Sequence, residues 1–499
     1  MQLKHLIAHL KTLELQGLDD REVVGIAYDS RRVTPGMVFV AIPGRNKDGH
    51  QFIPNAIDRG AAAIICEQNG FLPQRTVKIK VADSRAALAH VAAVFYQHPS
   101  SQLKVIGVTG TNGKTTVAFM IKAILEAAGI KTGLLGTIRY EIGERIIPAQ
   151  RTTPEALEVQ QMLAQMVRAG CQACVMEVSS HALEQKRVAH VEFDVAIFTN
   201  LTRDHLDYHG TMENYYAAKK KLFTTLRSPV KKSVAAINID DDFGGRLAMD
   251  NQLEVRLTYS LRQQAHIRAT DIQLARNATR MRIETPAHQF TCRLPLIGRH
   301  NVYNALAATA AAYALRLEPD GIQKALESMS PVPGRLESIT HGQPFAVLVD
   351  YAHTDDALFN VLTTLREITP GRLLLAFGCG GSRDAGKRPK MGKVAADLAD
   401  FSLITSDNPR KESAAAIAAQ IEIGFRTVRQ DGYRIELDRR RAIEDLIRAA
   451  RPGDTVLIAG KGHETYQEFE DTVVPFDDRA YAQETLELAG YSLDSKHKT

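Results

Sequence analysis

Short apolar runs alternate with amphipathic stretches over the middle of this chain. Runs with the length of buried strands lie at 104–109, 173–178, 194–199 and 233–238. The segments between them have helical periodicity, and strands that alternate with helices favour a mainly parallel sheet covered on both faces. Residues 253–295 differ, because their alternating apolar and polar positions predict short strands in an antiparallel flap, which an alanine-rich helix over 301–315 follows.

Two further α/β patterns flank this region. Near the N-terminus, strands are expected at 37–42 and 61–66, and an amphipathic helix is expected from Leu3, Leu6, Ile7, Leu10 and Leu13. After the turn-rich segment 331–335, strands are expected at 345–350, 372–377, 400–405 and 454–459. We therefore predict an α/β protein with three domains, at residues 1–98, 99–330 and 331–499, of which the last is Rossmann-like.

Composition and charge narrow the function classes. The chain has 499 residues, of which 44% are hydrophobic, and a net charge of +5 that is scattered along the sequence. Scattered charge argues against a nucleic-acid partner, and the absence of a long apolar run or a signal-peptide pattern predicts a cytoplasmic protein with no membrane partner. Five cysteines fit a reducing compartment, and Cys171-Gln-Ala-Cys174 leads into an expected strand, which favours a structural role over a metal or redox role.

The stretch after the 104–109 strand predicts a phosphate-binding loop. It consists of Gly110, Thr111, Asn112, Gly113, Lys114, Thr115 and Thr116, and a helix with its C-terminal cap at Gly129 follows. Backbone N–H groups of such a loop bind phosphate oxygens, the lysine reaches the β- and γ-phosphates, and a threonine hydroxyl ligates Mg²⁺. The first glycine of the Walker pattern would fall on Val108, so an ordinary glycine-rich turn remains the alternative.

Polar residues follow the neighbouring strands. Glu177 ends one strand, and Asp204 and His205 follow the next, where they are placed to hold Mg²⁺ beside the loop. A polar surface loop is the alternative. Residues 219–221 are three lysines, which by composition indicate a solvated helix face, and 240–242 are three aspartates, which favour an exposed turn over a metal site.

The expected strands of the third region also end in polar clusters. Four cations lie on adjacent strand-end loops, namely Arg383, Lys387, Arg388 and Arg410. Arginine binds carboxylates bidentately, and Asp407 with Glu464 would hold an amine. The clusters therefore predict a pocket for a substrate with both carboxylate and ammonium groups, with salt bridges between domains as the alternative.

Together these motifs resemble those of the Mur ligases of peptidoglycan precursor synthesis, over nearly the whole chain. The residues that carry the resemblance are Thr109–Thr116, Glu177-Val-Ser-Ser-His181, Asn200–His205, Gly298–Asn304, Pro333-Gly-Arg335 and Asp350-Tyr-Ala-His353. Within the family, Asp407-Asn-Pro-Arg410 resembles members that add meso-diaminopimelate rather than L-lysine as the third peptide residue. The physical reason is that diaminopimelate carries a far carboxylate for which Arg410 supplies a fork.

The resemblance implies an ATP-dependent ligase that acts on UDP-N-acetylmuramoyl-L-alanyl-D-glutamate through an acyl phosphate, with ATP and two Mg²⁺ ions, as a monomer. The catalytic residues would be Lys114, Lys219, Glu177 and His205, with Lys219 carried as a carbamate that ligates metal together with Thr115, Glu177 and His205. Besides the loop, ATP would contact His300, Asn301 and Asn304 of the central domain and Arg335 and Asp350 of the C-terminal domain.

The N-terminal domain would bind the UDP-sugar. By the same resemblance, the UDP-muramoyl-dipeptide would contact Tyr28, Ser30, Arg45, Asn46, Lys47, Arg151, Thr152, Thr153, Ser179, Gln185 and Arg187. Arg151 stands where the family often has asparagine. Diaminopimelate would contact Arg383, Asp407, Asn408, Pro409, Arg410, Gly460 and Glu464 in the C-terminal domain.

Three alternatives to this function differ in their substrates. A lysine-adding Mur ligase or a folylpolyglutamate synthetase shares the acyl-phosphate chemistry, but the second does not account for residues 407–410. A P-loop ATPase switch, in which the nucleotide state controls partner binding, leaves the Arg383, Arg410 and Glu464 cluster unexplained. Phosphate release from ATP that depends on an amino acid distinguishes the ligases from the switch.

Overall fold

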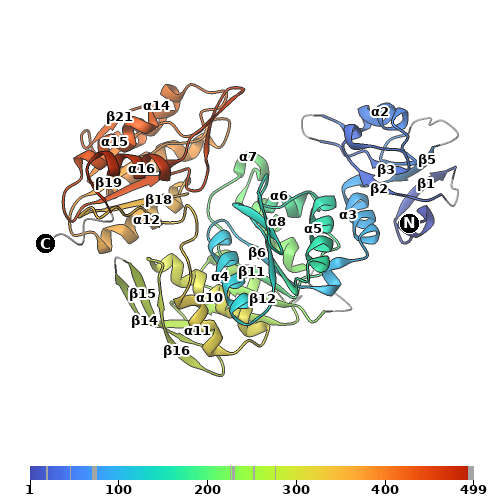
Figure 1. Ribbon diagram of the computed structural model, residues 1–499, viewed down its shortest axis with the longest axis horizontal. Coiled ribbons are helices and arrows are strands. Elements are labelled where there is room, and N and C mark those ends of the chain that lie inside the picture. The colour runs from blue at the N-terminus through green and yellow to red at the C-terminus, as the bar shows by residue number, and fades with distance from the viewer. Residues whose placement is uncertain are drawn as a thin grey trace.

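The computed structural model describes residues 1–17, 21–44, 47–69, 76–224, 226, 231–250, 253–275 and 277–492. Three α/β units follow one another along the chain, with the central unit between the other two (Figure 1). Their sheets have five, eleven and six strands, and a two-stranded hairpin lies near the C-terminus. The predicted three-unit α/β architecture is therefore confirmed.

The N-terminal sheet has the order β1-β5-β4-β3-β2. Its strands are β1 (Thr12–Gln16), β2 (Gly25–Ala27), β3 (Met37–Val40), β4 (Ala63–Cys66) and β5 (Val77–Val81), and its helices are α1 (Leu3–Leu6), α2 (Ile53–Asp58) and α3 (Ser84–Phe95). The predicted N-terminal helix was wrong beyond α1, because His9 has a positive φ of 62° and residues 12–16 pair with β5 as an edge strand. The hydrogen bonds that residues 12–16 form with β5 at the edge of the sheet therefore outweigh the helical spacing of the leucines.

The central sheet has the order β16-β15-β14-β13-β12-β11-β6-β10-β7-β8-β9. Its inner strands are parallel, as predicted. The strands are β6 (Lys104–Thr109), β7 (Thr132–Leu135), β8 (Arg139–Ile142), β9 (Arg145–Pro148), β10 (Ala173–Glu177), β11 (Val195–Phe198), β12 (Val234–Asn238), β13 (Arg256–Ser260), β14 (Ile267–Ala275), β15 (Ala278–Glu284) and β16 (Gln289–Leu294). The predicted flap over 253–295 is part of this sheet, because β13 pairs in parallel with β12, and only β14–β16 are antiparallel to one another.

Helices cover both faces of the central sheet. They are α4 (Lys114–Ala127), α5 (Ala156–Arg168), α6 (Ser180–Glu184), α7 (Leu206–His209), α8 (Met212–Thr224), α9 (Asp242–Ala248), α10 (Arg299–Ala314) and α11 (Pro319–Glu327). One buried core lies under α4, α10 and α11, and a second lies under α5 and α8. Cys171 and Cys174 are free thiols buried in the second core, as their strand position predicted.

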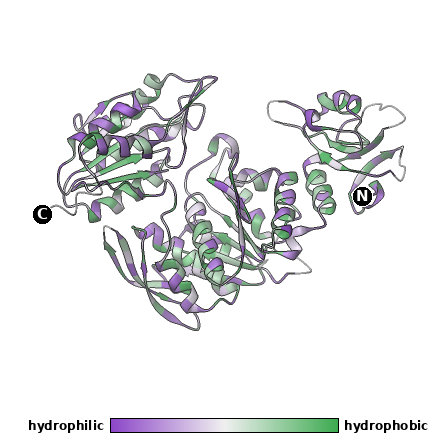
Figure 2. Cartoon of the chain, in the orientation of Figure 1, coloured by the Kyte–Doolittle hydropathy of each residue, from purple (hydrophilic) through white to green (hydrophobic). Residues whose placement is uncertain are grey.

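The C-terminal sheet has the order β17-β18-β22-β19-β20-β21. Its elements are β17 (Glu337–Ser338), β18 (Ala346–Asp350), α12 (Asp355–Ile368), β19 (Leu373–Phe377), α13 (Arg388–Leu398), β20 (Phe401–Ile404), α14 (Ala414–Arg426), β21 (Tyr433–Ile435), α15 (Arg439–Ala449), β22 (Thr455–Ala459) and α16 (Asp478–Leu488). The hairpin strands β23 (Tyr466–Phe469) and β24 (Thr472–Pro475) follow β22. Its strands are mostly hydrophobic whereas its helices mix both kinds of residue (Figure 2), which is the pattern of a sheet covered on both faces.

Strand register places the predicted clusters at one edge of each sheet. Glu177 pairs with Val108, and Phe198 pairs with Thr109, so the residues that follow β6, β10 and β11 lie side by side. In open parallel sheets this carboxyl edge is where ligands bind. In the described part of the chain, no helix is long and apolar enough to cross a membrane.

Candidate active site between the central and C-terminal domains

The loop between β6 and α4 has the backbone that a phosphate-binding loop requires. Gly110 and Gly113 have positive φ values of 149° and 87°. A Cβ on Gly113 would lie 2.4 Å from Oδ1 of Asn304, and one on Gly110 would lie 1.8 Å from Oγ1 of Thr199. Glycine is therefore required at both positions by conformation and by close packing.

Lys114 begins α4 and folds back over the loop. Its ammonium donates to the carbonyl oxygens of Gly110 at 3.0 Å and Thr111 at 2.8 Å. Desolvation lowers the pKa of this lysine, the Arg335 guanidinium lowers it too, and Glu177 and Asp204 oppose both effects. The side chain is thus held over the phosphate-binding loop.

Glu177 is buried at the end of β10 and is held by three donors. Its carboxylate accepts from the hydroxyl of Thr115 at 3.0 Å, and from the backbone N–H and the hydroxyl of Thr137 at 2.8 and 2.9 Å. A hydroxyl and a carboxylate next to the loop form the oxygen donor set that Mg²⁺ prefers when phosphates supply further ligands. These residues therefore fit a Mg²⁺–nucleotide complex.

Lys219 lies in α8 and is the buried member of the three consecutive lysines, with 1% of its surface exposed. The solvated-face interpretation was wrong for this lysine, whereas Lys220 and Lys221 make surface ion pairs with Asp250 and Glu184. The Lys219 ammonium donates to the Gly110 carbonyl at 2.7 Å and lies 4.5 Å from the centre of the Tyr215 ring. Desolvation, reinforced by Lys114, lowers the pKa of Lys219 well below its usual value.

His205 lies beside this lysine in a group of aromatic side chains. Its ring centre is 4.8 Å from that of His181 and 6.2 Å from that of Tyr215. Desolvation lowers the pKa of His205, so the imidazole is neutral near pH 7 and has a lone pair for a metal. Among the described residues no three His, Cys, Asp or Glu side chains converge as a metal site, so an ion here would need ligands of other kinds.

Two of the three aspartates after β12 have structural partners. Asp240 accepts from Ser260, Leu261 and Tyr303, and Asp241 accepts from the backbone of Leu201 and caps α9. Asp240 lies in a turn as predicted, and Asp242, the first residue of α9, is exposed, but Asp240 and Asp241 bond to neighbouring elements instead of facing solvent freely. They hold the β12 end next to the loop after β11.

Several contacts join the central and C-terminal domains around the phosphate-binding loop. The Asp356 carboxylate accepts from the Asn112 amide at 2.8 Å and from the Thr202 hydroxyl at 3.1 Å. Arg335 donates to the Thr115 hydroxyl at 3.2 Å, and its guanidinium lies 4.8 Å from the centre of the Tyr351 ring. The two domains therefore meet at the loop.

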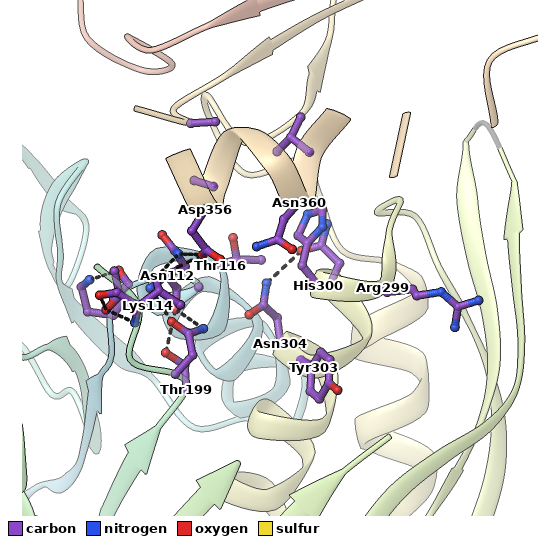
Figure 3. Close-up of a pocket in the computed structure, with 18 of the residues that line it drawn as sticks. Asn112, Lys114, Thr116, Thr199, Arg299, His300, Tyr303, Asn304, Asp356 and Asn360 are labelled. Carbon is purple, nitrogen blue, oxygen red and sulfur yellow. Dashed lines mark hydrogen bonds between the residues drawn. The ribbon is translucent and has the colours of Figure 1, made fainter. Parts of the chain in front are cut away.

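A cavity of about 690 Å³ lies between these domains and opens onto the loop. The side chains of His300, Asn304 and Asn360 gather in it beside Lys114 and Thr116, with α12 along one wall (Figure 3). Desolvation lowers the pKa of His300 to about 4, and the Asn304 amide donates to Asn301 at 3.0 Å. All the nucleotide residues expected from the sequence except Gly110 line this cavity, including Asp350 of β18.

A second pocket of about 560 Å³ belongs to the N-terminal domain. Tyr28, Ser30 and Lys47 line it, whereas Arg45 and Asn46 lie outside the described residues. Arg85 and Glu155 also line it, so the pocket extends to the start of α5 in the central domain. The Tyr28 hydroxyl donates to Glu158 at 2.8 Å, which fixes the tyrosine against that helix.

The residues expected to contact the dipeptide lie between this pocket and Glu177. Thr153 donates to the Glu177 carbonyl at 2.8 Å and accepts from the Ser179 backbone at 3.1 Å, and Thr152 lies within hydrogen-bond distance of Thr137. The cationic members, Arg151 and Arg187, both pair with Glu155, as does Arg85. Gln185 accepts from Arg187 at 2.6 Å. The arginine that departs from the family pattern is therefore held by a carboxylate four residues later.

Asp407, Asn408, Glu464 and the buried Lys461 form one cluster at the ends of β20 and β22. Asn408 donates to Glu464 at 2.9 Å, and Lys461 donates to both at 3.1 Å. Burial acts to raise the pKa of Asp407, but Lys461 and Arg439 outweigh it and the pKa is lowered. Burial and the Asp407 charge raise the pKa of Glu464.

The glycines of this region serve close packing of the loops. A Cβ on Gly381 would lie 1.8 Å from the Pro409 carbonyl oxygen, and one on Gly460 would lie 2.6 Å from a carboxylate oxygen of Asp407. Arg410 has a left-handed backbone, and its guanidinium donates to Glu468 at 2.8 Å and to the Gly381 carbonyl at 3.0 Å. The close loop packing brings Asp407–Arg410 next to Gly460.

The four predicted cations do not share one role. Arg383 is exposed, but Arg388 is 1% exposed and bonds to both oxygens of Glu412 at 2.8 and 2.9 Å. Arg388 and Glu412 both belong to the C-terminal domain, so Arg388 makes a salt bridge within that domain and not the salt bridge between domains that the alternative predicted. Lys387 is buried close to the Asp204 and Asp407 carboxylates.

The sequence analysis did not identify the residues that form hydrogen bonds or ion pairs with the predicted site residues. Thr137, Asp356, Glu155 and Glu468 lie outside every motif, and each contacts a predicted site residue. Asp356 carried a weak signal, because it lies in the first turn of a helix that follows the polar end of β18. The other three gave no signal, since their partners are distant in sequence or on other elements.

Models of one family match three consecutive segments of this chain. They are the Mur ligase family catalytic domain at residues 22–96, the Mur ligase middle domain at 108–312, and the Mur ligase glutamate ligase domain at 334–462. A UDP-N-acetylmuramoyl-L-alanyl-D-glutamate–2,6-diaminopimelate ligase from Syntrophomonas wolfei is 46% identical over 487 residues, which are 97% of this chain and 99% of that protein.

Solved structures show the same three-domain fold. A structure of a UDP-N-acetylmuramoyl-L-alanyl-D-glutamate–2,6-diaminopimelate ligase is 32% identical, with a TM-score of 0.70 over 99% of this chain and 100% of that one. A MurF ligase from Thermotoga maritima in complex with ADP is 20% identical, covers 93% of this chain and 96% of that one, has a TM-score of 0.63, and shows the fold alone. With the family models and these likenesses over nearly its whole length, the chain belongs to the Mur ligase family.

Proposed function

We propose that this protein is the ATP-dependent ligase that joins meso-diaminopimelate to UDP-N-acetylmuramoyl-L-alanyl-D-glutamate in peptidoglycan precursor synthesis. One path of contacts carries the proposal. Arg335 bonds to Thr115 of the phosphate-binding loop and stacks on Tyr351, whose hydroxyl lies 3.5 Å from Glu464. The path links a nucleotide pocket to a cluster with the charges of an amino acid site, which is the arrangement that a ligase requires and a nucleotide switch does not.

The first step transfers the γ-phosphoryl group of ATP to an oxygen of the D-glutamyl carboxylate, and ADP leaves. Phosphoryl transfer depends on positioning and on charge neutralisation. Lys114 supplies a positive charge when it exchanges the Gly110 and Thr111 carbonyls for phosphate oxygens. The backbone N–H groups of the loop and the Arg335 guanidinium hold the remaining phosphate charge.

Thr115, Glu177 and His205 are the residues we propose for Mg²⁺, with two ions in the active complex. Bound Mg²⁺ would neutralise phosphate charge and withdraw electrons from the transferred group. Carbamate formation on Lys219 requires a neutral amine, and the lowered pKa of this buried lysine supports it. The carbamate would replace the buried amine by an anion, which would give a metal ligand.

In the second step the amine of diaminopimelate attacks the acyl carbon of the phosphorylated substrate. A C–N bond forms, the C–O bond to phosphate breaks, inorganic phosphate leaves and the amine loses a proton to water. We propose that Asp407 and Glu464 bind the ammonium of the far end of the amino acid and that Arg383 and Arg410 bind its carboxylate. The Asn408 and Lys461 bonds to Glu464 keep this carboxyl in place before the amino acid arrives.

The three domains would divide the substrates between them. We assign UDP-sugar binding to residues 1–98, ATP binding to 99–330 and amino acid binding to 331–499. Tyr28, Ser30 and Lys47 line the N-terminal pocket, and Arg151 and Arg187 lead from it towards Glu177, which supports a bound dipeptide along this line. We further propose a cytoplasmic monomer.

An amino acid panel tests the function directly. Phosphate release is measured with ATP and the UDP-muramoyl-dipeptide held constant, while meso-diaminopimelate, L-lysine, L-glutamate or no amino acid is added. We expect release only with the dipeptide present, and at least tenfold higher kcat/KM for diaminopimelate than for lysine. Release without an amino acid would support the switch, and preference for lysine or glutamate would support the other ligases.

A further inference from the structure

The β23–β24 hairpin is joined to the loop that contains Arg410. The Arg410 backbone N–H donates to the Glu468 carbonyl at 2.9 Å, and the Glu470 N–H donates to the Arg410 carbonyl at 2.7 Å. The Glu468 N–H donates to the Asn408 side chain at 3.1 Å, and Gln467 donates to the Asp407 carbonyl at 2.9 Å. These bonds place strand β23 at a fixed position beside residues 407–410.

The Glu468 side chain forms a hydrogen bond with the guanidinium of Arg410. Its carboxylate accepts from Nε of Arg410 at 2.8 Å, and Nη1 donates to the Gly381 carbonyl at 3.0 Å. A guanidinium has five N–H groups in a rigid plane, so two anchored groups fix the orientation of the plane. Within the described part of the chain, the other three N–H groups, on Nη1 and Nη2, have no acceptor and can donate to a ligand.

Orientation matters because a long arginine side chain otherwise occupies many rotamers. Ordering it on ligand binding therefore costs conformational entropy. Side-chain exposure is 20% for Arg410 and 32% for Glu468, so the pair is partly shielded from water but open to a ligand. An Arg410 that is already ordered therefore binds a carboxylate at its terminal nitrogens with a smaller entropy loss.

We propose that Glu468 is a positioning residue that sets amino acid specificity, because it holds Arg410 with its terminal nitrogens free for the far carboxylate of diaminopimelate. The inference rests on the proposed function. Glu468 does not touch the substrate in this scheme, and its effect passes through Arg410. Substrates without a far carboxylate, such as L-lysine, do not bind more tightly because of the Arg410–Glu468 pair.

Steady-state kinetics of Glu468→Ala, Glu468→Gln and Asp471→Ala test the inference in the full-length protein. Asp471 is the matched control, since it is an exposed acid at the turn of the same hairpin. We expect Glu468→Ala to raise the KM for diaminopimelate about tenfold with kcat and the KM for ATP unchanged. Glu468→Gln should restore much of the affinity, because its amide oxygen still accepts from Nε, and Asp471→Ala should resemble the wild type.

A double-mutant cycle separates positioning from general stabilisation of the hairpin. In an Arg410→Ala background, Glu468→Ala should cause no further rise in the KM for diaminopimelate. An equal rise in both backgrounds would overturn the inference, because Glu468 would then act without Arg410. A fall in the KM for Glu468→Ala would also overturn it, because Glu468 would then compete with the substrate. A wild-type protein that does not use diaminopimelate refutes the proposed function instead.

Discussion

Gly113→Ala tests the phosphate-binding loop most directly. Gly113 has a φ of 87°, a conformation that costs an L-residue about 1–2 kcal/mol. Its new Cβ would lie 2.4 Å from Oδ1 of Asn304, whose amide nitrogen donates to Oδ1 of Asn301 at 3.0 Å. A displaced Asn304 would lose that hydrogen bond, which would lower the stability by about a further 1 kcal/mol. We therefore expect Gly113→Ala to lower the free energy of unfolding by about 2–3 kcal/mol in total, with the structural change located at the nucleotide site.

Gly129→Ala is the matched control, because Gly129 has a similar φ of 76° at the other end of α4 and nothing within 4 Å of its hypothetical Cβ. Both variants would be compared by ATP titration with a fluorescent analogue and by denaturant unfolding. Gly129→Ala should lose about 1–2 kcal/mol of stability from backbone strain and Gly113→Ala about 2–3 kcal/mol, but only Gly113→Ala should weaken nucleotide binding, by about tenfold or more. Equal nucleotide affinities in the two variants would refute the proposed packing of Asn304 against the loop.

Three other predictions concern buried charged groups. Lys219→Ala should abolish turnover, and partial recovery with short-chain carboxylates would support the carbamate, whereas full activity of the variant would exclude it. Arg439→Met should destabilise the C-terminal domain by about 3–5 kcal/mol, because it leaves the fully buried Asp478 carboxylate without its partner, and replacing both residues by apolar ones should cost less in denaturant unfolding. His300 has a pKa of about 4, below its ordinary 6.5, so the unfolded chain binds more protons between these values and stability should fall as pH drops from 6.5 to 4. His300→Gln should reduce this fall by about 3 kcal/mol, and an unchanged pH profile would contradict the shift.

The carboxyl-edge clusters could be predicted from the sequence because their signals are local. Gly110–Thr116 follows an apolar strand, and Asp407–Arg410 follows another, so periodicity and turn residues suffice to place them. The prediction of the N-terminal helix was wrong because a distant part of the chain determines the structure there. The predicted helix extended to Leu13, but Thr12–Gln16 pair with β5, which lies more than sixty residues away in the chain.

Local pattern alone therefore determined the three α/β units, most of their strands and the chemistry expected at the strand ends. Tertiary structure decided which of those side chains are buried or bound by other residues and which remain available to a ligand. Lys219 is buried against Gly110 while Lys220 and Lys221 are at the surface, and Arg388 is tied to Glu412 while Arg410 keeps three donors. Burial and ion pairing depend on residues far apart in the chain, and no local pattern of hydrophobic and polar positions encodes those distances.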